Sequence, residues 1–328
     1  MTTLLQERAN DDYDFYHYKP IVGVQCDFLS YFTCYAGFLA FQLFWLAKSK
    51  STKSLVPKKK FKRYINMMIP LLVGCIMEVL GYIARLISGL FPTHNKISMA
   101  PYIVQSIAIL VAPTLFAATI YMCLGELIRT LKVEDKSIIK TKYLTKVFVG
   151  GDVVSFLLQG NGASVAITSA LGGKIMVITG LVVQVIFFGL FCITQAILYA
   201  RLRRSPNAIC TEGIQFPSKY VNWRSYSYVL FASSILILIR SIYRTVEFIQ
   251  GEDGSIARNQ GFLYIFDSAL MNITVILLLA FNMPKFLILH EAKFGDSEPA
   301  HMEEIIVEKN SSAALGNKEL SQPLIPEL

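Results

Sequence analysis

Charge is scarce in this sequence. Only 16% of its 328 residues are Asp, Glu, Lys or Arg, whereas 54% are hydrophobic and the mean hydropathy is +0.48. A soluble domain carries roughly 25% charged residues, so much of the side-chain surface that would face water is missing. Because the apolar residues are concentrated in long runs, the composition argues against a soluble enzyme and indicates an integral membrane protein.

Motifs of catalysis and cofactor binding are also missing. The six cysteines include no Cys-x-x-Cys pair, and the four histidines lie outside the apolar runs or at their rims, away from where a haem would bind. Gly173-Lys174 lacks the upstream glycine of a phosphate-binding loop, and His290-Glu291 lacks the second histidine of a zinc protease. We therefore expect no enzyme activity, no metal and no cofactor.

Long apolar windows predict the membrane spans. A bilayer core about 30 Å thick needs about 20 helical residues, with every backbone group bonded inside the segment. Seven windows qualify: 21–47, 64–87, 101–124, 147–160, 175–200, 226–248 and 262–289. In the fourth window, Gly160, Asn161 and Gly162 either end the helix or bend it. The sequence thus predicts an all-α integral membrane protein, with a seven-transmembrane helix bundle at residues 21–290.

The positions of Lys and Arg predict the direction of the bundle. Of the 31 Lys and Arg residues, 23 lie in the connectors after the first, third and fifth windows and in the segment from Lys285. Only five lie in the amino-terminal segment and the other connectors. The positive-inside rule then makes 1–20 an extracellular N-terminus and 291–328 a cytoplasmic tail, whose composition predicts disorder. The net charge of +8 therefore reflects topology and does not indicate nucleic-acid binding.

One connector has a dense basic run, with Lys58, Lys59, Lys60, Lys62 and Arg63 close together. Such a run beside a span can attract anionic lipid, but it also determines topology. We interpret it as a topology determinant.

Ionisable side chains inside the predicted spans are the candidate functional residues, because each costs about 2.5–3.5 kcal/mol to insert. Glu78 and Arg85 are two turns apart on the second span, and three residues of the sixth span share one face. Under the predicted orientation, six candidates fall in the outer half of the membrane: Glu78, Arg85, Arg240, Arg244, Glu247 and Asp267.

These six residues have two interpretations. Three acids and three bases could neutralise each other as interhelical salt bridges that only fix packing. The same neutralisation is needed in a pocket or pathway that binds a polar head group, and this is our working hypothesis. A seventh candidate, Asp152 on the fourth span, is spaced to share a helix face with Ser155 and Gln159 and needs a partner or water.

Several strings of the sequence resemble one membrane-protein family. They are CIMEVLGYIAR at 75–85, PYIVQS at 101–106, AP at 112–113, AATIYM at 117–122, GDVVSFLLQ at 151–159, RSIYR at 240–244, EFIQG at 247–251 and YIFD at 264–267. Together they resemble the fungal RTA-like family of lipid-translocating exporters, in the family's order, from Tyr18 to about Met271.

The resemblance implies a seven-transmembrane fungal protein associated with the release of sphingoid long-chain bases, resistance to membrane-active compounds and, in some members, porphyrin or haem traffic. Plasma-membrane residence is implied in the same way, since no retention signal separates it from internal membranes. The family's His-Glu before the last span is Asn259-Gln260 here, and the stretch after Asp267 lacks the family's proline. These departures bear on substrate choice more than on the fold.

Two functions of different kinds follow as hypotheses. The first is a transporter or facilitator that moves amphipathic lipids, such as sphingoid bases, toward the outer leaflet and so gives resistance to membrane-active compounds. The alternative is a lipid- or drug-responsive sensor or regulator of other transport machinery, favoured by the missing energy-coupling element, or else a porphyrin or haem transporter. The expected partners are membrane lipids, with sphingoid bases among them, and not nucleic acid; the sequence does not specify protein partners.

Overall fold

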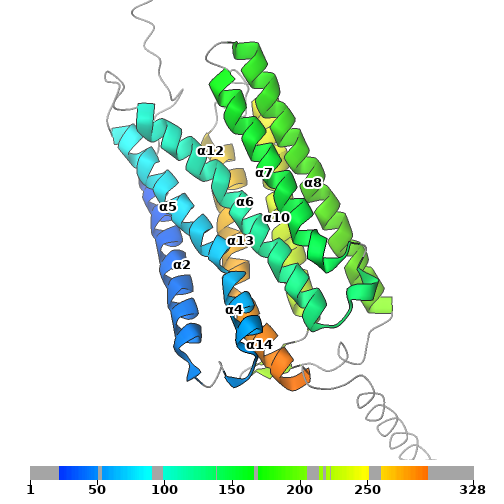
Figure 1. Cartoon of the computed structure of the whole chain (residues 1–328). Helices are drawn as coiled ribbons and strands as arrows, with labels where there is room; N and C mark the ends of the chain where they lie inside the picture. Colours follow the sequence, from blue (N-terminus) through cyan, green and yellow to red (C-terminus); the bar gives the residue numbers. More distant parts are fainter. Residues whose placement is uncertain are drawn as a thin grey trace, which may run out of the picture.

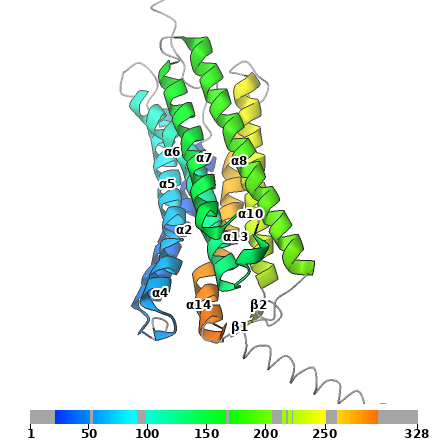
Figure 2. The ribbon, with the colours of Figure 1, turned by 45° about the vertical axis from the view of Figure 1, so that its right-hand side comes forward.

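Long helices aligned side by side make up the fold (Figures 1 and 2). The computed structural model describes residues 22–50, 54–90, 99–137, 139–165, 169–204, 214–216, 219–221, 223–250 and 260–294. The predicted extracellular segment 1–20 and most of the predicted tail, 295–328, lie outside the described residues.

Helices occupy all seven predicted windows. They are α2 (Val22–Lys48), α4 (Lys58–Asn66), α5 (Ile69–Leu90), α6 (Met99–Thr130), α7 (Thr141–Val165), α8 (Ala170–Arg204), α10 (Trp223–Gln250), α12 (Gln260–Leu263), α13 (Leu270–Ala280) and α14 (Met283–Phe294), with a 3-10 turn η2 (Glu134–Lys136) and a π-helical segment η3 (Tyr264–Ala269). Within the described residues, six helical stretches are long and apolar enough to cross a membrane; α7 is 25 residues long but is not among them. The multi-pass helical fold is therefore confirmed, while the count of seven spans and their direction stay predictions.

Most neighbouring helices in the chain also pack together. α5 packs against α2 and α6, and α7 lies along α8. α10 contacts α6, α8 and α13, and in Figure 1 α13 lies behind α6. α6 and α10 thus connect the pair α7–α8 to the rest of the bundle.

Glycines allow the close approach of α7 and α8. A Cβ atom at Gly180 of α8 would lie 2.8 Å from the Ser155 carbonyl oxygen, and one at Gly162 of α7 would lie 2.9 Å from the backbone nitrogen of Val177. Small residues at such contacts let membrane helices pack backbone to backbone. Gly162 therefore serves packing, whereas a Cβ atom at Gly160 would meet nothing within 4 Å, and α7 continues through both glycines to Val165.

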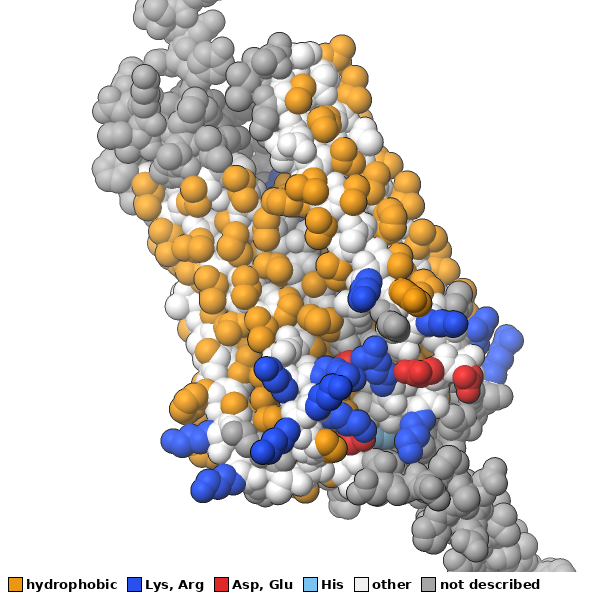
Figure 3. Space-filling view, viewed as in Figure 1, with side chains coloured by type: hydrophobic (Ala, Val, Ile, Leu, Met, Phe, Trp, Pro, Cys, Tyr) orange, Lys and Arg blue, Asp and Glu red, His pale blue; other side chains and the backbone are white. Residues whose placement is uncertain are grey.

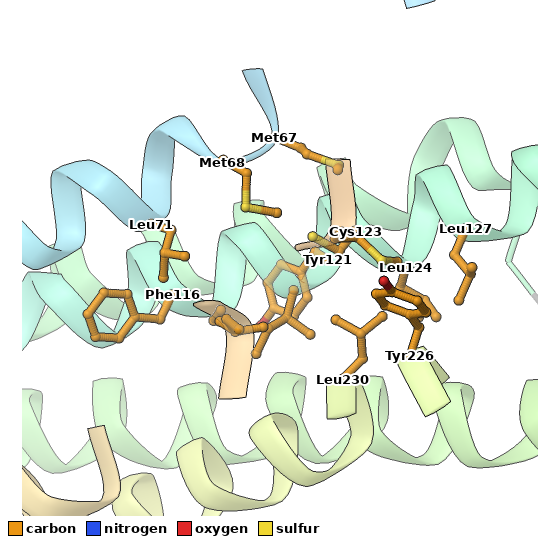
Figure 4. Packing of buried hydrophobic residues seen from close by; sticks show 14 of the residues in the cluster. Met67, Met68, Leu71, Phe116, Tyr121, Cys123, Leu124, Leu127, Tyr226 and Leu230 are labelled. Carbon is orange, nitrogen blue, oxygen red and sulfur yellow. The ribbon is translucent and has the colours of Figure 1, made fainter. Parts of the chain in front are cut away.

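Apolar side chains fill the interior and also cover the outside. Figure 4 shows part of the core, where Leu71, Phe116 and Tyr121 are fully buried. Hydrophobic side chains spread over the flank of the bundle in Figure 3, and Phe44 and Trp45 of α2 are 63% and 66% exposed. An apolar surface of this extent is expected to face lipid acyl chains.

Two predicted spans are not single helices. In the second, α4 ends at Asn66 and α5 begins at Ile69. The window 262–289 contains a π-helical segment and is interrupted at Phe281 and Asn282, next to Pro284, which has no backbone N–H to donate. Hydropathy does not detect either interruption, because the residues at both remain largely apolar.

The all-α fold class is confirmed, and a short pair of strands before α10 is the β-structure found in the described residues. Strands β1 (Ile214–Phe216) and β2 (Lys219–Val221) pair antiparallel, with Ile214 opposite Val221 (Figure 2). At the other end of the chain, α14 continues to Phe294, so residues 291–294 of the predicted disordered tail are helical. Glu291 forms an ion pair with Lys60 of α4.

Candidate functional site

Asp267 lies in η3, the π-helical segment Tyr264–Ala269. Such segments are rare, are usually a single turn long, and occur frequently at functional sites. The Asp267 side chain is buried, at 5% exposure. A carboxylate at this depth requires partners, and α10 supplies them.

Two arginines of α10 hold Asp267. Arg240 Nε lies 2.6 Å from its Oδ1, and Arg244 Nη2 lies 3.0 Å from its Oδ2. Arg244 also donates through Nη1 to Oε2 of Glu247, at 2.9 Å. The face of the sixth span predicted from helical spacing is thus present, and it is directed at the seventh.

A proline in α6 provides a further acceptor for Arg240. Pro113 has no N–H, so the carbonyl of Ile109, four residues earlier, loses its helical hydrogen bond. Arg240 Nη2 donates to this oxygen at 3.0 Å. Because freed backbone groups in a membrane helix need a substitute partner, Pro113 and Arg240 satisfy each other's requirements.

Glu78 and Arg85 reach the same region from α5, and both are buried. The Arg85 guanidinium lies 5.6 Å from the ring centroid of Tyr264 in η3, within cation–π range. Between them, Tyr82 donates a hydrogen bond to Ser268 at 2.6 Å. Glu78 lies within electrostatic range of Asp267, Arg240 and Arg244. None of the ion pairs among the described residues includes Glu78.

After their place under the predicted orientation, we call these six residues the outer charge cluster: Glu78, Arg85, Arg240, Arg244, Glu247 and Asp267. Their formal charges cancel, which reduces the cost of keeping them at bilayer depth. The pairs around Asp267 are well supplied with donors, whereas Glu78 is a buried carboxylate outside them. The cluster therefore combines a firmly held part with one buried acid that forms an ion pair with none of the cluster's arginines.

Asp152 is separate from the cluster. Tyr121 of α6 donates to its Oδ2 at 2.9 Å, and the Tyr121 ring packs among Phe148, Phe188 and Phe191. No described side chain hydrogen-bonds to Asp152 Oδ1. Of the seven predicted site residues, the structure brings six together and leaves Asp152 in an aromatic environment between α6, α7 and α8.

Sequence reasoning missed the neutral residues of the site. The hydrogen bond between Tyr82 and Ser268 joins residues 186 positions apart, so no local pattern predicts it. The only local signal was Pro113 itself, since a proline within a span identifies which carbonyl it frees.

An apolar cavity of about 220 Å³ lies toward the basic end of the bundle, between α6, α8 and α10. Leu124, Leu198 and Phe231 contribute to its apolar lining, and Gln195 is a polar residue in its wall. The Gln195 Oε1 accepts a hydrogen bond from Ser234 at 3.0 Å. Its Nε2 has no partner among the described residues.

The fold and the buried charges define a multi-pass helical membrane protein with a polar site inside an apolar bundle. Residues 71–290 match the family model described as RTA1 like protein. The chain belongs to this fungal family, as its resemblance predicted.

Several curated relatives support this assignment. Protein RTA1 of Saccharomyces cerevisiae is 34% identical over 90% of this chain and 93% of its own length. Protoporphyrin uptake protein 1 of the same yeast is 35% identical over 83% of this chain and 91% of its own. Probable lipid transporter atnI of Emericella nidulans is 27% identical over 63% of this chain and 55% of its own length. No solved structure matches.

Proposed function

We propose that this protein transports, or facilitates the movement of, an amphipathic lipid with a cationic head group toward the outer leaflet of the plasma membrane. Sphingoid long-chain bases are the class that fits. The observation that carries the proposal is Glu78, a carboxylate at 2% exposure that lies outside the ion pairs of its own cluster. An ammonium group that reaches it gains a charge-assisted hydrogen bond in a low-dielectric site.

Arg240 and Arg244 keep the rest of the site compensated in charge while a ligand enters or leaves Glu78. Arg240 and Arg244 hold Asp267, so the carboxylate of η3 stays compensated whether or not a ligand is present. Exchange is neutral in charge when a positively charged ammonium group enters as the proton of a protonated Glu78 leaves, because the site then takes up no uncompensated charge. Under this mechanism, lipid movement in one direction is coupled to proton movement in the other.

The apolar cavity suits the chain of such a lipid. It is lined by α6 and α10, and Arg240 of α10 also binds α6 through Ile109. Phe231 of the cavity is nine residues from Arg240, which is about 14 Å along a helix at about 1.5 Å per residue. A long alkyl chain spans this separation, so a lipid whose head group reaches Glu78 beside Arg240 can place its tail in the cavity along α10.

The names of the relatives are compatible with lipid transport and also suggest a second candidate function, porphyrin transport. One is named a probable lipid transporter and another a protoporphyrin uptake protein. A porphyrin would present carboxylates to Arg85, Arg240 or Arg244 and an aromatic face to Tyr264, next to which Arg85 lies. The two ligands therefore differ in which charges of the outer charge cluster they require.

The test is transport by the purified chain in phosphatidylcholine vesicles. Movement of a labelled sphingoid base between leaflets is measured for the wild type, for Glu78→Gln, and for Glu134→Gln, whose carboxylate is exposed on η2. We expect Glu78→Gln to slow movement at least about tenfold, the equivalent of roughly 1.4 kcal/mol, and Glu134→Gln to leave it unchanged.

Equal rates in empty and protein-containing vesicles would reject lipid transport. If labelled protoporphyrin moves instead, and Glu78→Gln leaves its rate unchanged while Arg85→Gln abolishes it, the second candidate is correct.

A further inference from the structure

A second cavity, of about 350 Å³, opens at the basic end of the bundle, between α4, α6 and α7. It shares no lining residue with the apolar cavity and includes no member of the outer charge cluster. Its residues on α6, from Met122 to Arg129, lie on the side of α4 and α7. Figure 3 shows Lys and Arg side chains gathered at this end of the bundle. The volume is in the range of pockets that hold small ligands, about 300–1,000 Å³.

The charge of this cavity is strongly positive. Lys59, Lys62 and Arg63 of α4 and Arg129 of α6 line it, against the single acid Glu126. Four cations that face one acid leave an excess that a bound anion can neutralise.

Glu126 positions two of the cations. It is buried at 7% exposure, and its carboxylate lies 2.7 Å from Arg129 Nη1 and 3.6 Å from Arg63 Nη1. The two guanidinium groups are thereby held at the cavity from opposite helices. Such preorganisation reduces the side-chain entropy that a ligand would otherwise have to overcome.

The position of α4 is also held from outside the cavity. Lys60, on the same helix, pairs with Glu291 of α14, and Tyr64 donates to the Glu291 carboxylate at 3.4 Å. Lys60 is therefore engaged elsewhere, whereas Lys59 and Lys62 face the cavity. The basic run that we interpreted as a topology determinant is thus divided by the fold into residues with different contacts.

The surroundings indicate that the anion belongs to a lipid. Thr141 and Thr145 of α7 line the cavity, while Tyr143 and Val147 in the same turns are 51% and 45% exposed apolar side chains. Met67 and Met122 form apolar wall beside the cations. A ligand bound here would have its charged group among lysines and arginines and its chains next to lipid-facing side chains, as in basic interhelical pockets that bind anionic head groups.

We propose that this cavity binds the phosphomonoester head group of an anionic lipid from the leaflet that the basic end faces. Lys59, Lys62, Arg63 and Arg129 bind the phosphate oxygens, and Asn66 and Thr145 supply neutral hydrogen-bond donors. The site binds lipid independently of any substrate at the outer charge cluster.

The experiment measures lipid binding by the full chain in phosphatidylcholine nanodiscs. The probe is a fluorescent phosphatidylinositol 4,5-bisphosphate, and the competitors are its unlabelled form, phosphatidylserine and inorganic phosphate. The cavity variant is Lys59→Gln/Lys62→Gln/Arg63→Gln. The matched control, Lys50→Gln/Lys58→Gln/Arg204→Gln, removes the same charge from exposed positions outside the cavity.

We expect the cavity variant to bind the probe at least tenfold more weakly and the control within twofold of the wild type. The unlabelled phosphoinositide should displace the probe, whereas phosphatidylserine and inorganic phosphate should need at least tenfold higher concentrations. Equal weakening in both variants, or displacement by inorganic phosphate as effective as by the lipid, would overturn the proposal. If the triple variant does not fold, the single variant Lys62→Gln, whose side chain is exposed, replaces it. We expect it to bind the probe more weakly than the wild type, and an unchanged affinity would count against the site.

Discussion

Arg240 links α10 to two other elements, since it binds Asp267 of η3 and the Ile109 carbonyl of α6. Removing one partner of a buried ion pair costs about 3–5 kcal/mol, whereas replacing both with apolar side chains of similar volume is often neutral. We therefore expect Arg240→Met to lower the thermal unfolding midpoint of the purified protein and Arg240→Met/Asp267→Leu to recover most of the loss. Lipid movement should be lost in both variants.

This pair of variants separates packing from function. The control Arg203→Met, at an exposed position near the end of α8, should change neither midpoint nor transport. Transport that returns together with stability in the double variant would show that the Arg240–Asp267 pair serves packing alone.

At the level of the helix, Pro113 removes one backbone hydrogen bond from α6 and leaves the Ile109 carbonyl free to accept from Arg240. Alanine at this position would supply an N–H that competes with Arg240 for the Ile109 oxygen. Proline in a helix interior costs about 3 kcal/mol relative to alanine. Pro113→Ala is therefore expected to raise the unfolding midpoint and to slow lipid movement.

The matched variant is Pro70→Ala, in the first turn of α5, where the backbone N–H has no intrahelical partner in any case. It should leave both measurements near the wild type. A lower midpoint for Pro113→Ala would mean that the shape of α6 at Pro113, and not the freed carbonyl, is what the bundle requires.

A second prediction at the level of helices concerns the close contact between α7 and α8. Gly180→Ala places a Cβ atom 2.8 Å from the Ser155 carbonyl, and backbone at that distance has little room to move. We expect a loss of about 1–3 kcal/mol, typical of overpacking, measured as a lower unfolding midpoint.

Gly189 provides the control on the same helix. A Cβ atom there meets nothing within 4 Å, so Gly189→Ala should be neutral or stabilising, by up to about 1 kcal/mol from helix propensity. Equal effects at the two positions would contradict close packing of α7 on α8.

For the molecule as a whole, the prediction of seven spans requires that α7 cross the membrane. Ser137 precedes α7 and Ser169 follows it. In a variant without the six native cysteines, Ser137→Cys and Ser169→Cys should react with a membrane-impermeant thiol reagent from opposite sides of sealed vesicles. Labelling from the same side would mean six spans and would reverse the predicted orientation of everything after α6.

Helix positions were predictable because apolar length is a local property of the chain. The window 226–248 differs from α10 by only a few residues at each end, and helical spacing placed Arg240, Arg244 and Glu247 on one face. The interruptions were not predictable. The π-helical segment around Asp267 and the break after α13 depend on how the backbone is packed, and neither changes the local hydropathy.

The sequence alone determined the membrane class, the positions of the helices, the family and the set of charged residues within the predicted spans. Which charges meet was settled in three dimensions, because Glu78, Arg240 and Asp267 lie on three helices and their pairing depends on interhelical geometry. The same holds for the basic run, whose members are divided between a cavity and an ion pair by the packing of α4 against α6 and α14. Charge count is set by composition, whereas the partner of each charge is set by the distances that packing imposes.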